Sequence, residues 1–177
     1  TKSVGKILFW PYFFLARKAI SESTSISSMS DGFIDWVKGF NIDDNTKDYH
    51  VFPLTSPNFK ISDAQKNDAQ KWWDNLHLLE ENSIKICFIG SISQAFKFEP
   101  IKKAALIALQ RDLNIQFIIC GDGNDANKIK KSFISLTNVI FPGWINRPQI
   151  EVLAQRCLAS LAPYKNTNNF QANIPNK

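Results

Sequence analysis

The feature that most constrains the fold is a regular alternation of apolar, strand-like segments with helical patterns that begins at Ile84. The strand-like segments are residues 84–89, 115–120, 139–141 and 158–162. The helical patterns between them start at Pro100, near Asp125, and after Asn146, a residue suited to an N-cap. Strands separated by helices form βαβ units with parallel strands and right-handed crossovers. The sequence therefore predicts an α/β fold with a Rossmann-like parallel sheet.

The residues before this alternation are organised differently and resemble the end of another unit. Helices are expected over residues 12–23 and from Ser30 onward, followed by a strand over residues 49–54. A turn-rich connector at 55–61 leads to a third helix, which Ser62 can cap and which runs to about Leu79.

Residues 7–15 (ILFWPYFFL) are the most hydrophobic segment and are too short to cross a bilayer as a helix. Two interpretations stay open. The segment is core whose packing partner lies elsewhere, which we favour, or it is an interfacial helix that makes peripheral membrane contact. The basic residues that would flank such a helix are Lys2, Lys6, Arg17 and Lys18.

The net charge and the spacing of the cysteines limit the kinds of ligand and the location that we expect. The net charge of +5 suits an anionic small molecule or membrane surface, or simply a lysine-rich solvated face. The lysines are scattered, with no basic run interleaved with aromatic residues, so we expect no nucleic-acid partner. Cys87, Cys120 and Cys157 lie in or beside apolar runs without CxxC spacing, which predicts buried thiols, no zinc site and a cytoplasmic location.

Loop chemistry follows three of the predicted strands at the point where each strand ends. Gly90-Ser91 follows the first strand, Gly121-Asp122-Gly123 the second, and Pro142-Gly143-Trp144-Ile145 the third. Each motif alone is typical of an ordinary turn. In a parallel sheet these loops share the edge where ligands bind, and glycine lets a phosphate approach the backbone. Their coincidence predicts a nucleotide site, although GxGxxG, GxxxxGK[ST] and GxSxG are all absent.

The order of five motifs resembles a known family. The motifs CFIGSIS, FIICGDGND, NVIFPGWI, CLASLAPY and IPNK follow one another between residues 86 and 177. This order is similar to the carboxyl-terminal, donor-binding domain of GT-B glycosyltransferases of family four (group 1). The segment SMSDGFIDWV resembles the end of the family's amino-terminal domain, and VFPL resembles its hinge.

The resemblance implies half of a GT-B fold that is incomplete at both ends. Residues 1–54 would be the tail of the acceptor-side domain with the hinge, and residues 55–177 a partial nucleotide-sugar-binding domain. The implied activity is retaining transfer from a nucleotide diphosphate sugar to a saccharide or lipid-linked acceptor in bacterial surface polysaccharide or glycoconjugate biosynthesis. The donor is a substrate, and neither a cofactor nor a metal is expected.

The resemblance also implies a donor-binding role for particular residues. Gly90 would face the diphosphate, followed by Ser91 where the family often has arginine. Lys97 would reach the phosphates, although the family's Lys-Gly pair is replaced by Ala95-Phe96-Lys97-Phe98. The remaining matches line the nucleoside, the nucleobase and the mouth of the fourth strand: Gly121, Asp122, Gly123, Trp144, Ile145, Pro163 and Tyr164.

The largest departure from the family concerns the segment E-x7-E, which contacts the donor sugar and which residues 1–177 do not contain. No catalytic residue is therefore assigned, and we expect this stretch of chain alone to lack turnover. Two alternatives remain: a non-catalytic nucleotide-binding Rossmann-like module, and a Rossmann-like interaction domain that binds no ligand.

Overall fold

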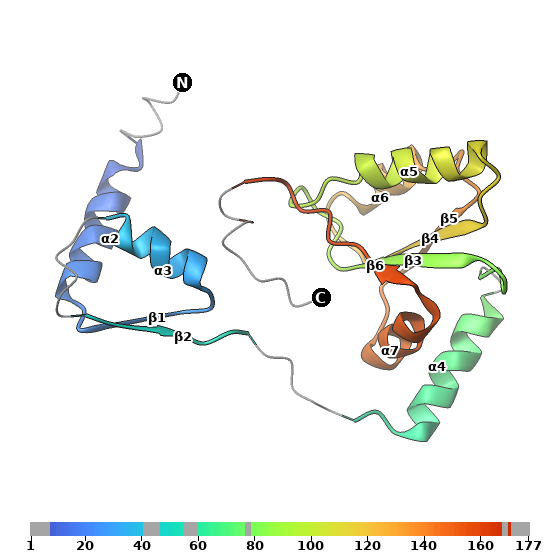
Figure 1. The fold of residues 1–177 in the computed structure, drawn as a ribbon, viewed down its shortest axis with the longest axis horizontal. Helices are drawn as coiled ribbons and strands as arrows, with labels where there is room; N and C mark the ends of the chain where they lie inside the picture. Colours follow the sequence, from blue (N-terminus) through green and yellow to red (C-terminus); the bar gives the residue numbers. More distant parts are fainter. Residues whose placement is uncertain (1–7, 41–46, 55–59, 77–78, 168–169, 171–177) are drawn as a thin grey trace. The chain divides into compact units, whose positions relative to one another are not determined.

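A computed structural model describes residues 8–40, 47–54, 60–76, 79–167 and 170. They form two compact units, the first built from the elements α2 to β2 and the second from α4 to β6 (Figure 1). Among the predicted features, Lys2, Lys6, most of the 55–61 connector and the IPNK motif lie outside the described residues.

The first unit is a small parallel pairing with two helices. It contains α2 (Trp10–Glu22), β1 (Ser25–Ser28), α3 (Asp31–Lys38) and β2 (Asp48–Val51). The strands β1 and β2 pair in parallel with Ile26 opposite Tyr49. The helix α3 begins after Ser30 as predicted. Asp31 lies in its first turn, where the negative charge interacts favourably with the positive end of the helix dipole.

The strand β1 was missed, and β2 differs from the predicted strand. The four residues of β1 are SISS, so a single apolar side chain carries no readable alternation. The predicted strand at 49–54 is displaced, because β2 ends at Val51 where its pairing with β1 stops at Ser28.

The helix α2 exposes almost all of its aromatic side chains. Pro11 lies in its first turn, where a missing N–H costs nothing, and the helix has no buried residue. Its large exposed apolar residues, with those just before it, are Leu8, Phe9, Trp10, Tyr12, Phe13, Phe14 and Leu15. No helix within the described ranges combines the length and the apolar content that a membrane span requires.

The second unit contains a four-stranded parallel sheet with the order β5-β4-β3-β6. The strands are β3 (Ile84–Ile89), β4 (Ile115–Cys120), β5 (Val139–Gly143) and β6 (Ala159–Ser160). Every pairing is parallel, with Ile86 opposite Phe117 in β4 and opposite Ala159 in β6. The α/β fold with a Rossmann-like parallel sheet is confirmed. The predicted strand at 158–162 is shortened to two residues, and Leu158, Ala159 and Ser160 are all exposed at this outer strand.

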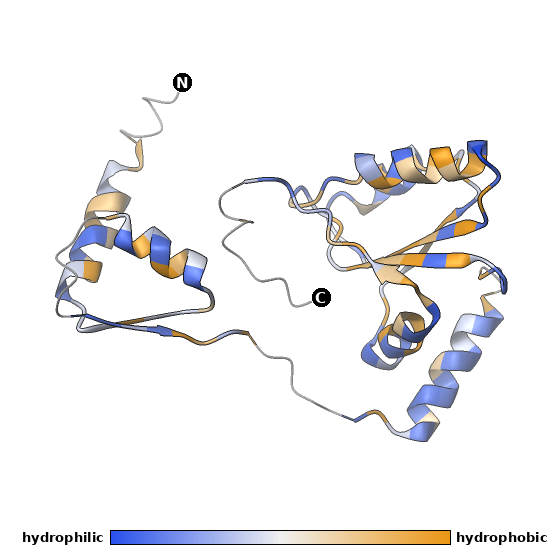
Figure 2. Cartoon of the chain, viewed as in Figure 1, coloured by the Kyte–Doolittle hydropathy of each residue, from blue (hydrophilic) through white to orange (hydrophobic). Residues whose placement is uncertain are grey.

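Helices cover both faces of this sheet (Figure 1). The helices α5 (Glu99–Gln110) and α6 (Ala126–Ser132) pack on one face around Phe88, Ile119 and Phe133. The helices α4 (Asp63–Asn75) and α7 (Arg147–Arg156) pack on the other around Trp73, Ile118 and Leu153. Figure 2 shows β3 and β4 largely orange, as expected for strands covered on both faces.

The predicted caps of this unit are present, and two helix ends differ from the prediction. Ser62 and Asn146 each form a capping box, with Gln65 and Gln149 respectively. The helix α4 ends at Asn75 rather than near Leu79. The helix α6 runs over 126–132 rather than 125–135, because the chain turns there to bury Phe133 in the core.

Two buried polar side chains hold the turn before β3, at the edge opposite to the strands' carboxyl ends. Lys85 is buried, and its ammonium donates hydrogen bonds to the backbone carbonyls of Glu80 and Ser83. Gln116, its partner across the β3–β4 pair, accepts a hydrogen bond from the Glu80 amide at 3.3 Å. These bonds satisfy groups that would otherwise be costly to bury.

Candidate functional site

The loops that leave the carboxyl ends of β3, β4 and β5 are joined by backbone hydrogen bonds. The Gly90 amide donates to the Cys120 carbonyl at 3.0 Å, and the Gly121 amide to the Gly143 carbonyl at 2.7 Å. Farther out, the Ile92 amide donates to the Asp122 carbonyl at 2.9 Å. The three loops therefore form one continuous backbone surface along this edge of the sheet.

Glycine is required where these loops meet. A Cβ on Gly121, whose φ is +132°, would lie 1.9 Å from the Gly90 carbonyl oxygen. A Cβ on Gly123, at φ +154°, would lie 2.5 Å from the Ile92 oxygen. Gly143, at φ +88°, has no atom within 4 Å of the same position, so only its backbone conformation favours glycine there.

The side chains of this edge include exposed polar groups, an exposed tryptophan and buried isoleucines. Ser91 and Asp122 are exposed, and the Asp122 carboxylate accepts a hydrogen bond from the Gly123 amide at 2.7 Å. Trp144 is 72% exposed, whereas its neighbour Ile145 is only 4% exposed and packs in the core beside α7. Trp144 can thus present its ring to a ligand, while Ile145 can offer only its backbone.

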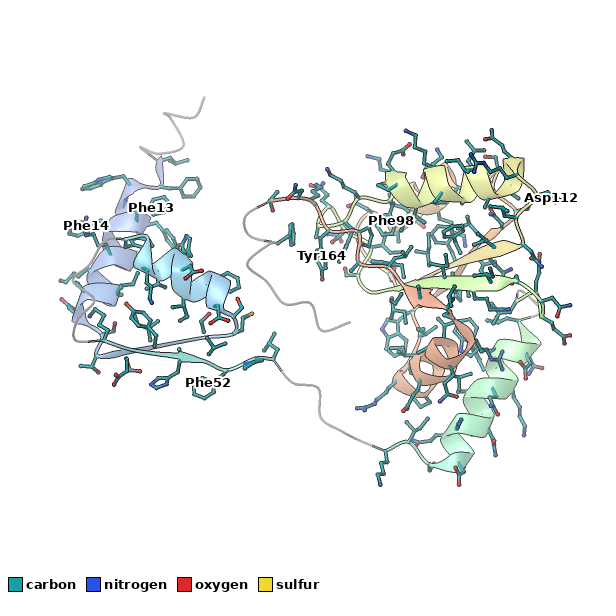
Figure 3. All side chains as sticks on the ribbon, viewed as in Figure 1. Phe13, Phe14, Phe52, Phe98, Asp112 and Tyr164 are labelled. Atoms are coloured by element: carbon teal, nitrogen blue, oxygen red, sulfur yellow. The ribbon has the colours of Figure 1, made fainter. Side chains whose placement is uncertain are left out.

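A second pair of loops flanks the point where the strand order reverses. From β3 the chain moves outward to β4 and β5, and it then returns to the other side of β3 to form β6. In open parallel sheets, ligands bind at this reversal. The loop before α5 and the loop after β6 meet there through a bridge between Phe96 and Tyr164, whose ring centroids lie 4.6 Å apart. Figure 3 shows Tyr164 at the end of the unit opposite to Asp112.

All of the sequence-predicted residues lie on these loops. Gly90, Ser91, Gly121, Asp122, Gly123, Trp144 and Ile145 lie on the joined backbone surface, and Lys97, Pro163 and Tyr164 lie on the pair of loops at the strand reversal. Sequence reasoning missed Ile92, Phe96 and Lys165. Ile92 is buried and bonded to both the Asp122 carbonyl and the Asp125 amide. The bridge between Phe96 and Tyr164 joins distant segments and leaves no local sequence signal.

The hollows that adjoin these loops are not suited to a phosphate. One of about 580 Å³ starts at Pro163 and runs along α5 to Leu113, lined by apolar side chains such as Ile101 and Ile107. Another of about 340 Å³ lies between α4 and the start of α7, and its lining includes the Asp68 carboxylate, which would repel a phosphate. The polar backbone surface at the strand ends is therefore the better candidate for an anionic ligand.

The cysteines lie beneath this edge and are not placed for chemistry there. Cys87 and Cys120 are buried, as predicted, and Cys157 is half-buried. Burial raises the pKa of the Cys120 thiol to about 12. A hydrogen bond with Cys87 raises the pKa of Cys157, and the same bond lowers the pKa of Cys87 to about 7 despite its burial. Within the described part of the chain, no three acidic, histidine or cysteine side chains gather as a metal site would require.

The fold matches solved structures of GT-B glycosyltransferases. HepE from Anabaena in complex with UDP-glucose superposes over 84% of this chain and 40% of its own, with 14% identity and a TM-score of 0.57. WaaG, a glycosyltransferase involved in lipopolysaccharide biosynthesis, matches over 80% of this chain and 38% of its own, with 15% identity and a TM-score of 0.55. A glycosyltransferase from Rickettsia africae covers 80% and 39%, with 11% identity and a TM-score of 0.54.

These matches extend over most of the chain but only part of each neighbour. The chain spans about two-fifths of the length of those structures. No family model matches the sequence, and no curated protein matches it either. The fold is therefore the Rossmann-like α/β fold of GT-B glycosyltransferase domains, established by structure rather than by sequence identity.

Proposed function

We propose that the chain belongs to a glycosyltransferase and that its second unit binds the nucleoside diphosphate of a nucleotide-sugar donor. The observation that carries this proposal is the backbone surface formed by Gly90, Gly121 and Gly143, which are hydrogen-bonded through three adjacent strand ends. A diphosphate needs a surface without side chains, which lets it approach the backbone closely, and a position near the reversal of strand order. Two of the solved structures that share the fold are complexes of HepE with UDP and glucose or with UDP-glucose, which supports this type of ligand.

The site would bind the donor without a metal or cofactor. Lys97 is exposed at the strand reversal and can neutralise phosphate charge, while Ser91 offers a hydroxyl group beside Gly90. The exposed Trp144 ring would border the nucleobase, next to the Ile145 backbone. Gly121, Asp122 and Gly123 would line the nucleoside, and Pro163 and Tyr164 would close the side of the site next to β6.

The whole protein would transfer the donor sugar, with retention of configuration, to a saccharide or lipid-linked acceptor in bacterial surface polysaccharide or glycoconjugate biosynthesis. It would do so in the cytoplasm, where the exposed aromatic helix α2 allows peripheral contact with a membrane. Residues 1–177 alone would bind donor without transfer, since catalysis also needs an oriented acceptor and a stabilised leaving diphosphate.

Calorimetry tests this function directly. Titration of the 177-residue chain with UDP, GDP and ADP is expected to give saturable 1:1 binding with one of the three nucleotides. Sugar transfer is then assayed with the matching nucleotide sugar, on this chain and on the complete gene product. If the nucleotide binds both to the 177-residue chain and to the complete gene product, and only the complete product transfers the sugar, the proposal is supported. Binding without transfer by the complete product favours a non-catalytic module, and no heat with any nucleotide favours a scaffold without a ligand.

A further inference from the structure

The two loops at the strand reversal run antiparallel for three residues each. The Lys97 amide donates to the Pro163 carbonyl at 2.7 Å, and the Lys165 amide donates to the Ala95 carbonyl at 3.1 Å. These two bonds enclose Phe96 and Tyr164 as a directly opposed pair. We call residues 95–97 and 163–165 the loop clamp.

The alternation of side chains in this clamp decides which residues face the core. Side chains of opposed residues share one face of an antiparallel pair, and the flanking residues occupy the other face. The Phe96 and Tyr164 rings contact each other at an interplanar angle of 41°, and Phe96 also contacts the core residues Phe88 and Phe98, with ring centroids 5.1 and 6.4 Å away respectively. The aromatic pair thus faces the core, so Lys97 and Lys165 share the opposite face.

The geometry places the two lysines within reach of one small anion. They are diagonal neighbours across the pair, for which Cα atoms lie about 7–8 Å apart. Lysine stems are long and flexible enough for both ammonium groups to converge on a diphosphate. The ion pairs of the described residues join Lys18 to Glu22 and Arg156 to Asp74, so neither clamp lysine is paired with a carboxylate there.

We propose that Lys97 and Lys165 together bind the diphosphate at the strand reversal, a role that rests on the proposed donor site. The resembled family often has an arginine at the position of Ser91, which carries no charge. In this chain Lys165 provides that second cation instead. Two like charges held on one face repel each other without a ligand, and a bound diphosphate, with its multiple negative charges, relieves that repulsion. The contact between the Phe96 and Tyr164 rings and the two backbone hydrogen bonds beside it fix the backbone from which both lysines extend.

The test compares Lys97→Gln and Lys165→Gln with Lys71→Gln, an exposed lysine on α4 that serves as a matched control. Each variant of the 177-residue chain is titrated with UDP, with uridine and with inorganic pyrophosphate, and circular dichroism checks that the fold is retained. Each clamp variant is expected to bind UDP and pyrophosphate about tenfold more weakly, because each loses a charge-assisted hydrogen bond to phosphate. Uridine affinity should not change, and the control should match the unmodified chain with every probe.

The outcomes separate the lysine pair from the donor site. If UDP binds and Lys165→Gln leaves its affinity unchanged, the lysine pair is wrong and the proposed function stands. If no nucleotide binds but pyrophosphate binds and is weakened by both clamp variants, the pair stands and the proposed function falls. Loss of pyrophosphate and UDP binding in the Lys71→Gln control, or no binding of either probe to the unmodified chain, overturns the pair.

Discussion

Replacing Gly121 with alanine tests how closely the loops of β3 and β4 approach each other. The new Cβ would lie 1.9 Å from the Gly90 carbonyl oxygen and 2.9 Å from its carbonyl carbon. Both are backbone atoms of a neighbouring strand end, so no side-chain rotation can relieve the overlap. The φ of +132° adds a strain of about 1–3 kcal/mol for a residue with a side chain. Overpacking adds about 1–3 kcal/mol more, which gives a total loss of about 2–6 kcal/mol.

Gly143→Ala is the matched control for this change. Gly143 also has a positive φ, +88°, but nothing lies within 4 Å of a Cβ there. This variant should lose only the conformational part, about 1–3 kcal/mol. The measurement is amide hydrogen exchange of β3 and β4, which reports opening of the second unit alone. If the two variants lose the same free energy of opening, the close approach of Gly121 to Gly90 is not present in solution.

Three further predictions concern the core and the surface of the second unit. Trp73→Phe should lower the free energy of unfolding by about 1–3 kcal/mol, because the buried indole donates a hydrogen bond to the Gln149 carbonyl at 2.9 Å that phenylalanine cannot replace. Asp74→Asn, on the same helix, should lower the free energy of unfolding in urea by less than about 1 kcal/mol, because the Asp74 side chain that pairs with Arg156 is 64% exposed. Equal losses for Trp73→Phe and Asp74→Asn would contradict both estimates. The raised pKa of Cys120, about 12 against 9.0 for an ordinary thiol, contributes stability that is present below pH 9 and is lost as the pH rises toward 12. Between pH 8 and pH 10 the unmodified chain should therefore lose about 1.4 kcal/mol more than Cys120→Ala, and parallel pH profiles of the two proteins would refute the assignment.

Much of the second unit could be predicted because its segments carry strong local patterns. The strands 84–89 and 115–120 were predicted with their observed bounds, since each is a mainly apolar run, interrupted only by Lys85 or Gln116, that is followed directly by a glycine. The capping residues Ser62 and Asn146 were also readable, because each precedes a polar residue three positions later that completes a capping box. Strand β1 could not be found in this way, because one isoleucine among serines has no periodicity.

The candidate site shows a different limit of sequence reasoning. The glycines were read as positions where a phosphate could approach the backbone. The structure gives Gly121 and Gly123 a second reason, which is the packing of one loop against the next. Lys97 was found from the family resemblance, which implies a Lys-Gly pair just before the next helix. Lys165 was not, because its relation to Lys97 depends on a bridge between Phe96 and Tyr164 that only the folded chain forms.

The sequence left two interpretations of the hydrophobic segment in α2 open, and the structure shows why it does not decide between them. Its aromatic side chains are spread around the helix rather than along one stripe, and none of its residues is buried. The first half of α2, Trp10 to Ala16, is apolar on all sides, and such a segment usually belongs to a larger core or to a membrane surface. Both interpretations of this segment stay predictions.

The most direct test of the central claim is a titration of the isotope-labelled 177-residue chain with UDP, followed by amide chemical shifts. GDP and ADP are titrated in parallel, so that the choice of base does not decide the outcome. We expect one nucleotide to perturb the amides of Gly90–Ser91, Gly121–Gly123, Trp144–Ile145 and the clamp lysines Lys97 and Lys165. Saturable shifts confined to α4, to α2 or to the hollow along α5, or no shifts with any of the three nucleotides, would contradict a donor site at the carboxyl edge of the sheet.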